Sequence, residues 1–205
     1  MRGQAHTLEA ITAALLVLSA VVFALQVTAV TPLTGSTSSQ HIENQQTELA
    51  EGLLAAEDRN GTLRGALLFG NKSTGEWRFH NASGAGYTSG GPPTPFGTAL
   101  DETLLERGIA FNVYVRYPSS NTTGHLDVDN ATRQRVQLVN LGEPSDHATS
   151  VTRLVTLYDS DRLRDADGTE TATTVGDGAL YATHDVSPET DVYTVVEVEV
   201  VVWRM

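Results

Sequence analysis

Residues 10–30 form the most apolar stretch of this 205-residue chain, and polar and charged residues dominate the sequence after it. As an α-helix, twenty such residues span about 30 Å, which matches the hydrocarbon thickness of a bilayer. The charge on the N-terminal side is basic, from Arg2, whereas the other side is acidic. By the positive-inside rule the N-terminus then stays in the cytoplasm and the rest of the chain lies outside. The pattern predicts one membrane-spanning helix over residues 10–30.

A secretory signal peptide is the alternative interpretation of the same run. Small residues between Ala24 and Ala29 offer cleavage sites of the kind that signal peptidases use. The run is longer than most signal-peptide cores, which favours a retained anchor. An anchor that is not processed at all is a further alternative.

Beyond the membrane, the sequence predicts a linker and then a second helix. Thr31-Pro32 should end or kink the first helix, because proline lacks a backbone donor and disfavours helix at the preceding residue. Residues 31–39 are small and hydroxylated, and we expect them to form the linker. Apolar residues at helical spacing then predict a helix from about Ser38 to Asp58, which Asn60-Gly61 ends.

Alternation of apolar and polar residues predicts several strands in the remainder of the chain. The clearest strand covers residues 109–117, and in the last one four valines face one side while Glu197 and Glu199 face a partly wet side. The other expected strands are 75–80, 135–141, 151–158 and 193–203. The sequence also predicts a helix at 96–107, a long loop at 81–97, an exposed loop or hairpin tip at 159–178, and an ambiguous segment at 61–69. We therefore predict an α+β domain over residues 40–205: a helix packed on a mainly antiparallel sheet.

Composition narrows the setting of this domain. The chain has no cysteine, which excludes disulfides and thiolate metal sites. Its net charge of −12 argues against nucleic-acid binding, which needs a basic surface. Lys72 is the single lysine among thirteen basic residues. Many carboxylates with almost no lysine resemble the proteins of salt-loving archaea, in which high salt screens the repulsion between acidic groups.

Five N-x-Ser/Thr motifs follow the apolar run, all in segments expected to be exposed. Together they indicate an extracellular, N-glycosylated body. The predicted acceptors are Asn60, Asn71, Asn81, Asn121 and Asn130. The alternative is that a threonine-rich sequence produces such motifs by chance.

The start of the chain resembles a type IV pilin. Arg2-Gly3-Gln4 resembles the site of the archaeal prepilin peptidase, with cleavage after Gly3 and Gln4 as the mature N-terminus. Thr7-Leu8-Glu9 before the apolar run resembles the pilin core motif, although Glu9 then becomes the sixth mature residue, one place later than in that family. The residues up to Leu33 are most similar to haloarchaeal type IV pilin-like membrane proteins of uncharacterised function.

This resemblance implies a leader and mature start in residues 1–9, a prepilin peptidase as a partner, and assembly with like or related pilin subunits. It also implies that Glu9 pairs with the terminal amine of a neighbouring subunit. A carboxylate in an apolar helix bundle needs such a cation. The alternative is that Glu9 merely lies at the cytoplasmic interface of an anchor.

The remaining candidate motifs lack the residues that their chemistry requires. Residues 65–73 resemble a phosphate-binding loop, but Asn71 intrudes before the lysine. Residues 165–170 begin like a calcium loop, with carboxylates at alternate positions and then a glycine, but the glutamate that usually completes the ligand set is missing. The sequence does not decide whether residues 161–170 bind calcium. Residues 125–129 resemble a calcium loop still less. Ser145-Asp146-His147 contains the residue types of a catalytic triad, but residues adjacent in sequence do not converge on one atom. We expect no catalytic residues, no metal and no cofactor, and therefore no enzyme.

The predicted function is a pilin-like, membrane-anchored and N-glycosylated structural or interaction subunit of the cell surface. The alternative is an unprocessed single-pass surface protein whose outer domain binds a ligand or the cell envelope. The sequence names no ligand for that domain.

Overall fold

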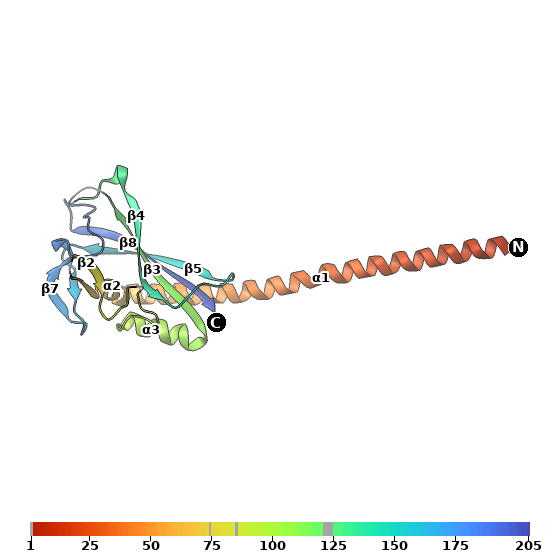
Figure 1. Ribbon diagram of the computed structural model, residues 1–205, viewed down its shortest axis with the longest axis horizontal. Coiled ribbons are helices and arrows are strands. Elements are labelled where there is room, and N and C mark those ends of the chain that lie inside the picture. Colours follow the sequence, from red (N-terminus) through yellow and green to blue (C-terminus); the bar gives the residue numbers. More distant parts are fainter. Residues whose placement is uncertain (1, 74, 85, 121–124) are drawn as a thin grey trace. The chain divides into compact units, whose positions relative to one another are not determined.

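A computed structural model describes residues 2–73, 75–84, 86–120 and 125–205 of the chain. The chain divides into two compact units, Met1–Asn44 and Gln45–Met205. Helix α1 (Arg2–Arg59) is shared between the two units: its apolar part lies in the first unit, and its last turns lie in the second. Figure 1 labels most of the elements, which are numbered in chain order.

The predicted linker at residues 31–39 and the separate second helix are wrong. The backbone there is helical, and α1 passes through Pro32 without ending. Proline removes one backbone donor and crowds the preceding turn, which weakens or kinks a helix but leaves the hydrogen bonds on either side available. The end predicted at Asn60-Gly61 is confirmed, since α1 stops at Arg59 and Gly61 has a φ of 75°.

Two shorter helices follow in the second unit. The ambiguous segment 61–69 contains α2 (Thr62–Leu67). The helix predicted at 96–107 is α3 (Pro95–Thr103) followed by a 3₁₀ turn, Leu105–Arg107. Thr94 caps α3 by accepting a hydrogen bond from the Gly97 N–H. Gly108 ends the segment with a φ of 73°, a conformation that suits glycine.

A four-stranded antiparallel sheet forms the centre of the second unit, which confirms the α+β prediction. Its order is β4-β3-β8-β5, so the C-terminal strand lies between two strands that come earlier in the sequence. The strands are β3 (Ile109–Ser119), β4 (Thr132–Asn140), β5 (Thr149–Tyr158) and β8 (Val192–Arg204). All four were predicted, with shorter bounds.

Two small hairpins accompany this sheet. One pairs β1 (Gly70–Ser73) with β2 (Glu76–Phe79), and only β2 was predicted. The other pairs β6 (Arg162–Arg164) with β7 (Glu170–Thr174), within the segment expected to be a loop or hairpin tip. A parallel bridge between Phe69 and Arg164 joins the start of the first hairpin to the second.

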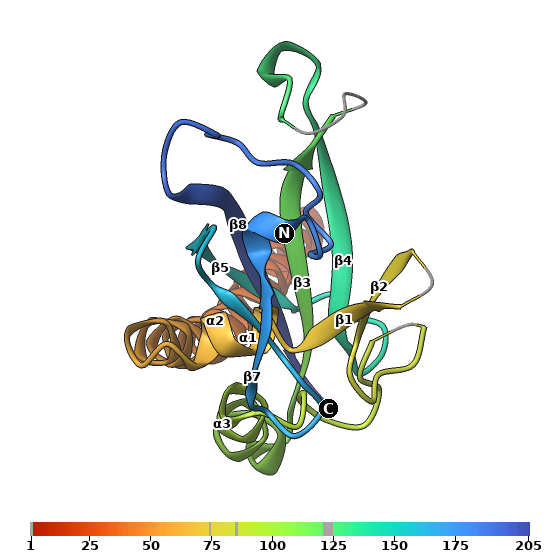
Figure 2. The ribbon, with the colours of Figure 1, turned by 90° about the vertical axis from the view of Figure 1, so that its left-hand side faces the viewer.

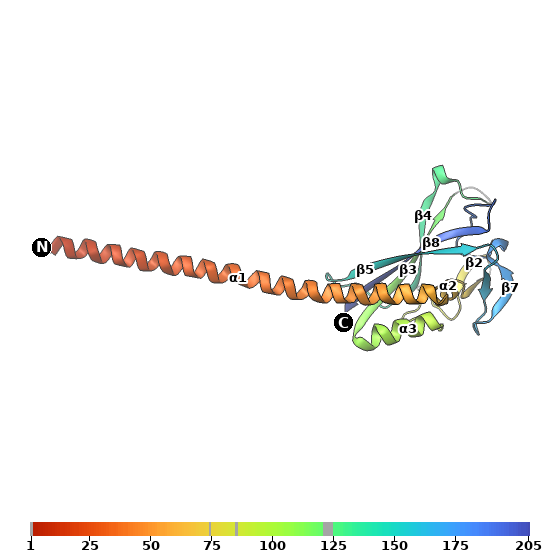
Figure 3. The same cartoon turned by 180° about the vertical axis from the view of Figure 1, so that it is seen from behind.

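The hydrophobic core lies between the helices and one face of the large sheet. Figures 2 and 3 show these helices and strands from two sides. The four valines predicted to share a face of β8 are buried, and each helix contributes apolar side chains. These residues are Val196, Val198, Val200 and Val202 of β8, Leu53 and Leu54 of α1, Leu63 and Leu67 of α2, and Phe96 and Leu100 of α3. The core thus holds the second unit together without disulfides.

The opposite face of the sheet carries the predicted glutamates, which ion pairs cover in part. Arg116 of β3 contacts both Glu197 and Glu199 of the neighbouring strand. Arg133 of β4 also reaches Glu197, with 3.5 Å between Nη1 and Oε2. The two glutamates are therefore half-buried rather than fully wet.

Candidate functional site

The apolar part of α1 is the most prominent candidate for function. His6–Gln26 is 21 residues long and apolar enough to cross a membrane. Its large apolar side chains lie open, with 47–72% of their surface exposed: Leu8, Ile11, Leu15, Leu16, Val17, Leu18, Val21, Val22, Phe23 and Leu25. Burial of such a surface stabilises by about 25 cal/mol per Å². A membrane-spanning helix and a signal sequence both fit this description.

Polar side chains within this segment find partners on the helix itself. Thr12 Oγ1 donates to the carbonyl oxygens of Leu8, at 3.1 Å, and Glu9, at 2.9 Å. Ser19 Oγ donates to the carbonyl oxygen of Leu15 at 2.7 Å. These hydroxyls need no water, so they are compatible with an apolar surrounding.

The predicted processing and assembly residues occupy the first turns of α1. Arg2, Gly3 and Gln4 begin the helix. The Glu9 side chain is 81% exposed, and its Oε2 lies 3.8 Å from Nδ1 of His6, one turn earlier. When protonated, this imidazole gives Glu9 a local cation. Pairing of Glu9 with a neighbouring subunit stays a prediction.

Four predicted glycosylation sites fall on described residues, and all four asparagines are exposed. Asn60 lies in the turn after α1, Asn71 in β1, and Asn130 at the end of the 3₁₀ turn Val128–Asn130. Asn81 follows β2 and has a φ of 61°, a conformation that asparagine tolerates better than most residues. The fifth site, Asn121, lies outside the described residues. Occupancy stays a prediction for each.

Residues 165–169, which include Asp165 and Asp167, form the turn of the β6–β7 hairpin. Asp165 accepts a hydrogen bond from the Ala166 N–H, and Asp167 accepts from both the hydroxyl and the N–H of Thr169. The hydroxyl bond, followed by the backbone bond, holds the pKa of Asp167 below its ordinary value. Over the residues that the structure describes, no three histidine, aspartate or glutamate side chains are grouped to hold a metal. These carboxylates stabilise the turn.

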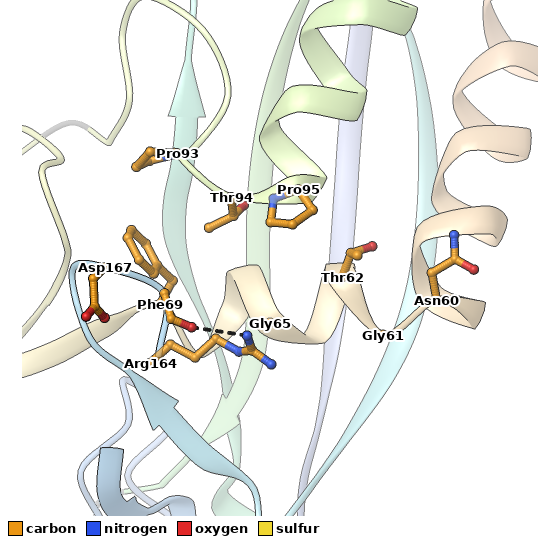
Figure 4. A pocket seen from close by; sticks show the side chains of 11 residues that line it. Asn60, Gly61, Thr62, Gly65, Phe69, Pro93, Thr94, Pro95, Arg164 and Asp167 are labelled. Atoms are coloured by element: carbon orange, nitrogen blue, oxygen red, sulfur yellow. Dashed lines mark hydrogen bonds between the residues drawn. The ribbon is translucent and has the colours of Figure 1, made fainter. Parts of the chain in front are cut away.

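A cavity of about 380 Å³ lies beside this turn, and the sequence analysis missed it. Its walls come from the α1–α2 turn, the loop before α3, and the β6–β7 hairpin (Figure 4). Arg164 forms part of one wall, where Nη1 donates to the Gly168 carbonyl at 3.3 Å and Nη2 lies 3.6 Å from Glu170. The lining residues are Asn60, Gly61, Thr62, Gly65, Phe69, Pro93, Thr94, Pro95, Arg164, Asp167 and Gly168. Because segments far apart in the sequence form this cavity, no local sequence pattern predicts it.

Comparison with known proteins identifies one family. The sequence profile of a family of unknown function, DUF7288, matches residues 2–202, which includes both the apolar helix and the sheet domain. No significant match was found among curated proteins or among solved structures.

Proposed function

The chain belongs to this family of unknown function, and we propose that it is a pilin-like, membrane-anchored subunit of the cell surface. In this proposal the apolar part of α1 stays in the mature protein and lies in the membrane or in a bundle with like subunits. The Gln45–Met205 unit is displayed outside the cell and carries N-linked glycans.

The observation that carries the proposal is the distribution of exposed apolar surface. Ten large apolar side chains lie open within His6–Gln26. Among described residues of the second unit, the exposed large hydrophobic side chains are few: Leu154, Tyr158, Val195 and Met205, with Leu154 and Val195 on the same outward face of β5 and β8. A soluble surface rarely carries a contiguous apolar patch as large as the one on α1. The helix therefore needs an apolar surrounding, whereas the second unit has its own core and does not.

The N-terminal residues support the pilin-like part of the proposal. Cleavage after Gly3 would place a free amine on Gln4 and leave Glu9 as the first carboxylate of the mature chain. The position of Glu9, sixth rather than fifth, instead favours the alternative of an unprocessed anchor. Substitution Gly3→Val separates the two, because it blocks processing and leaves a slightly larger product only if the peptidase normally cleaves there.

A charged residue within the apolar segment tests the anchor itself. Leu18→Arg places a charge near the middle of the segment, at a cost of about 2.5–3.5 kcal/mol for insertion. We expect a large fraction of the variant to leave the membrane pellet after carbonate extraction. Leu154→Arg is the matched control, since Leu154 in β5 is 66% exposed and Leu18 is 65% exposed. If both variants stay equally in the pellet, the anchor lies elsewhere and the proposal fails.

A further inference from the structure

The glycosylation motif at Asn60 coincides with the rim of the cavity. Asn60, Gly61 and Thr62 all line it, whereas Asn71, Asn81 and Asn130 do not. Thr62 is fixed in place because its hydroxyl donates to the Glu57 carbonyl at 3.0 Å and bonds the Glu57 carboxylate. The α1–α2 turn therefore holds this motif at a set position beside the cavity.

The cavity has the size and chemistry to accept sugar rings. Its volume of about 380 Å³ falls within the range of small-ligand pockets, about 300–1,000 Å³. Pro93 and Pro95 are exposed and offer apolar surface, which suits the C–H face of a pyranose ring. Asp167 and Arg164 also line the cavity; the carboxylate can accept hydrogen bonds from sugar hydroxyls, and the guanidinium can donate to them. In Figure 4, Asn60 lies at one end of this set, and Phe69 and Asp167 lie at the other.

We propose that the first sugars of a glycan on Asn60 fold back into this cavity and bind there. The glycan would then act as a structural part of the protein, joining the α1–α2 turn, the loop before α3 and the β6–β7 hairpin. This inference rests on the proposed function, because it requires the second unit to lie where glycans are added.

Because the glycan is covalently attached to Asn60, weak contacts with its sugars are sufficient to keep it in the cavity. A tethered group experiences a local concentration in the millimolar range when its linker matches the distance to its site. A free saccharide of the same affinity would have to be supplied at that concentration. The glycans on Asn71, Asn81 and Asn130 start away from the cavity and lack this advantage.

Glycoprotein purified from its native host provides the test, by comparison of melting temperatures. Asn60→Gln removes the glycan and keeps an amide, and we expect it to lower Tm by about 2–4 °C. Amide hydrogen exchange should rise in residues 61–65, at Thr94 and in residues 164–168. Asn130→Gln is the matched control, since it removes a glycan from an exposed site outside the cavity, and Tm should not change.

A double-mutant cycle assigns the effect to the cavity. Pro93→Ala removes apolar surface from its wall, and Pro93 is exposed enough to change without disturbing the core. We expect Pro93→Ala to lower Tm more in the glycosylated protein than in the Asn60→Gln background. Equal effects in both backgrounds, or an unglycosylated Asn60 beside a glycosylated Asn130, overturn the inference alone. A chain without glycan at any of the described sites would count against the external location in the proposed function as well.

Discussion

Arg153 of β5 donates two hydrogen bonds to one carboxylate oxygen of Asp58 in the last turn of α1. The distances to Oδ2 are 2.9 Å from Nε and 2.7 Å from Nη2. Arg153 occupies the core-facing side of β5 between buried Val151 and Val155, where a guanidinium needs a partner. The pair therefore fixes the end of α1 to the edge strand of the sheet.

Removal of this pair should destabilise the second unit modestly. The side chains of Arg153 and Asp58 are 42% and 27% exposed, so solvent screens the pair and we expect a coupling energy of about 0.5–1 kcal/mol. A double-mutant cycle with Asp58→Asn and Arg153→Met measures it by chemical denaturation. The control pair is Glu76 and Arg78, which is 78% and 67% exposed and should give a coupling near zero. Equal coupling in both pairs would contradict the role assigned to Arg153.

Gly97 is expected to tolerate no side chain. A Cβ at this position would lie 1.8 Å from the Pro92 carbonyl oxygen, so the loop that lines the cavity would have to move away from α3. We expect Gly97→Ala to lower the free energy of unfolding by about 1–3 kcal/mol, as overpacking does. Gly52→Ala is the matched comparison within α1, because its Cβ meets nothing within 4 Å and alanine favours helix by about 0.5–1 kcal/mol. Opposite shifts of Tm are predicted, and a stabilising Gly97→Ala would show that the contact is absent.

Tyr193 should make stability depend on pH in the alkaline range. Burial, with smaller contributions from Asp185 and Asp159, raises the pKa of Tyr193 from 10.0 to about 12. The folded state thus disfavours the phenolate, and its hydroxyl donates to the Ala182 carbonyl at 3.0 Å. The contribution of this group is complete below pH 10 and is lost as the pH rises from 10 to 12.

Substitution of this tyrosine isolates its share of the alkaline transition. Tyr193→Phe removes the titrating hydroxyl, so its stability should fall less steeply than that of the parent chain between pH 10 and 12. Denaturation at a series of pH values measures both slopes, and tyrosinate absorbance follows the titration. Identical slopes in the two proteins would show that Tyr193 ionises at its ordinary pKa.

The strands could be predicted from the sequence because each one alternates between a buried and an exposed side. In β8 the valines face the core and the glutamates face Arg116, as the pattern indicates. The end of α1 could also be predicted from Asn60-Gly61, because glycine readily adopts the left-handed conformation that ends a helix, and Gly61 does adopt it. Pro32 misled the prediction, because a proline weakens a helix locally without deciding whether the helix resumes.

Some features of the candidate sites could likewise be predicted from the sequence, and others could not. Exposure of the apolar run on α1 and of Asn60, Asn71, Asn81 and Asn130 follows from local sequence, and the structure agrees with it. The cavity depends on segments about one hundred residues apart, such as Gly65 and Arg164, and on the tertiary contacts between them. No periodicity or motif encodes that proximity, so it could be found only in the folded chain.

Mass spectrometry of the protein isolated from its native membrane determines the mature N-terminus, and this end shows whether the chain is processed and keeps its apolar helix. We expect a chain that begins at Gln4 and retains the whole apolar segment His6–Gln26. A chain that begins at Met1 or Arg2 would contradict pilin-like processing and leave a plain anchor. A chain that begins after Ala24 would mean that the segment is a removed signal peptide, which contradicts the membrane-anchored subunit proposed for this protein.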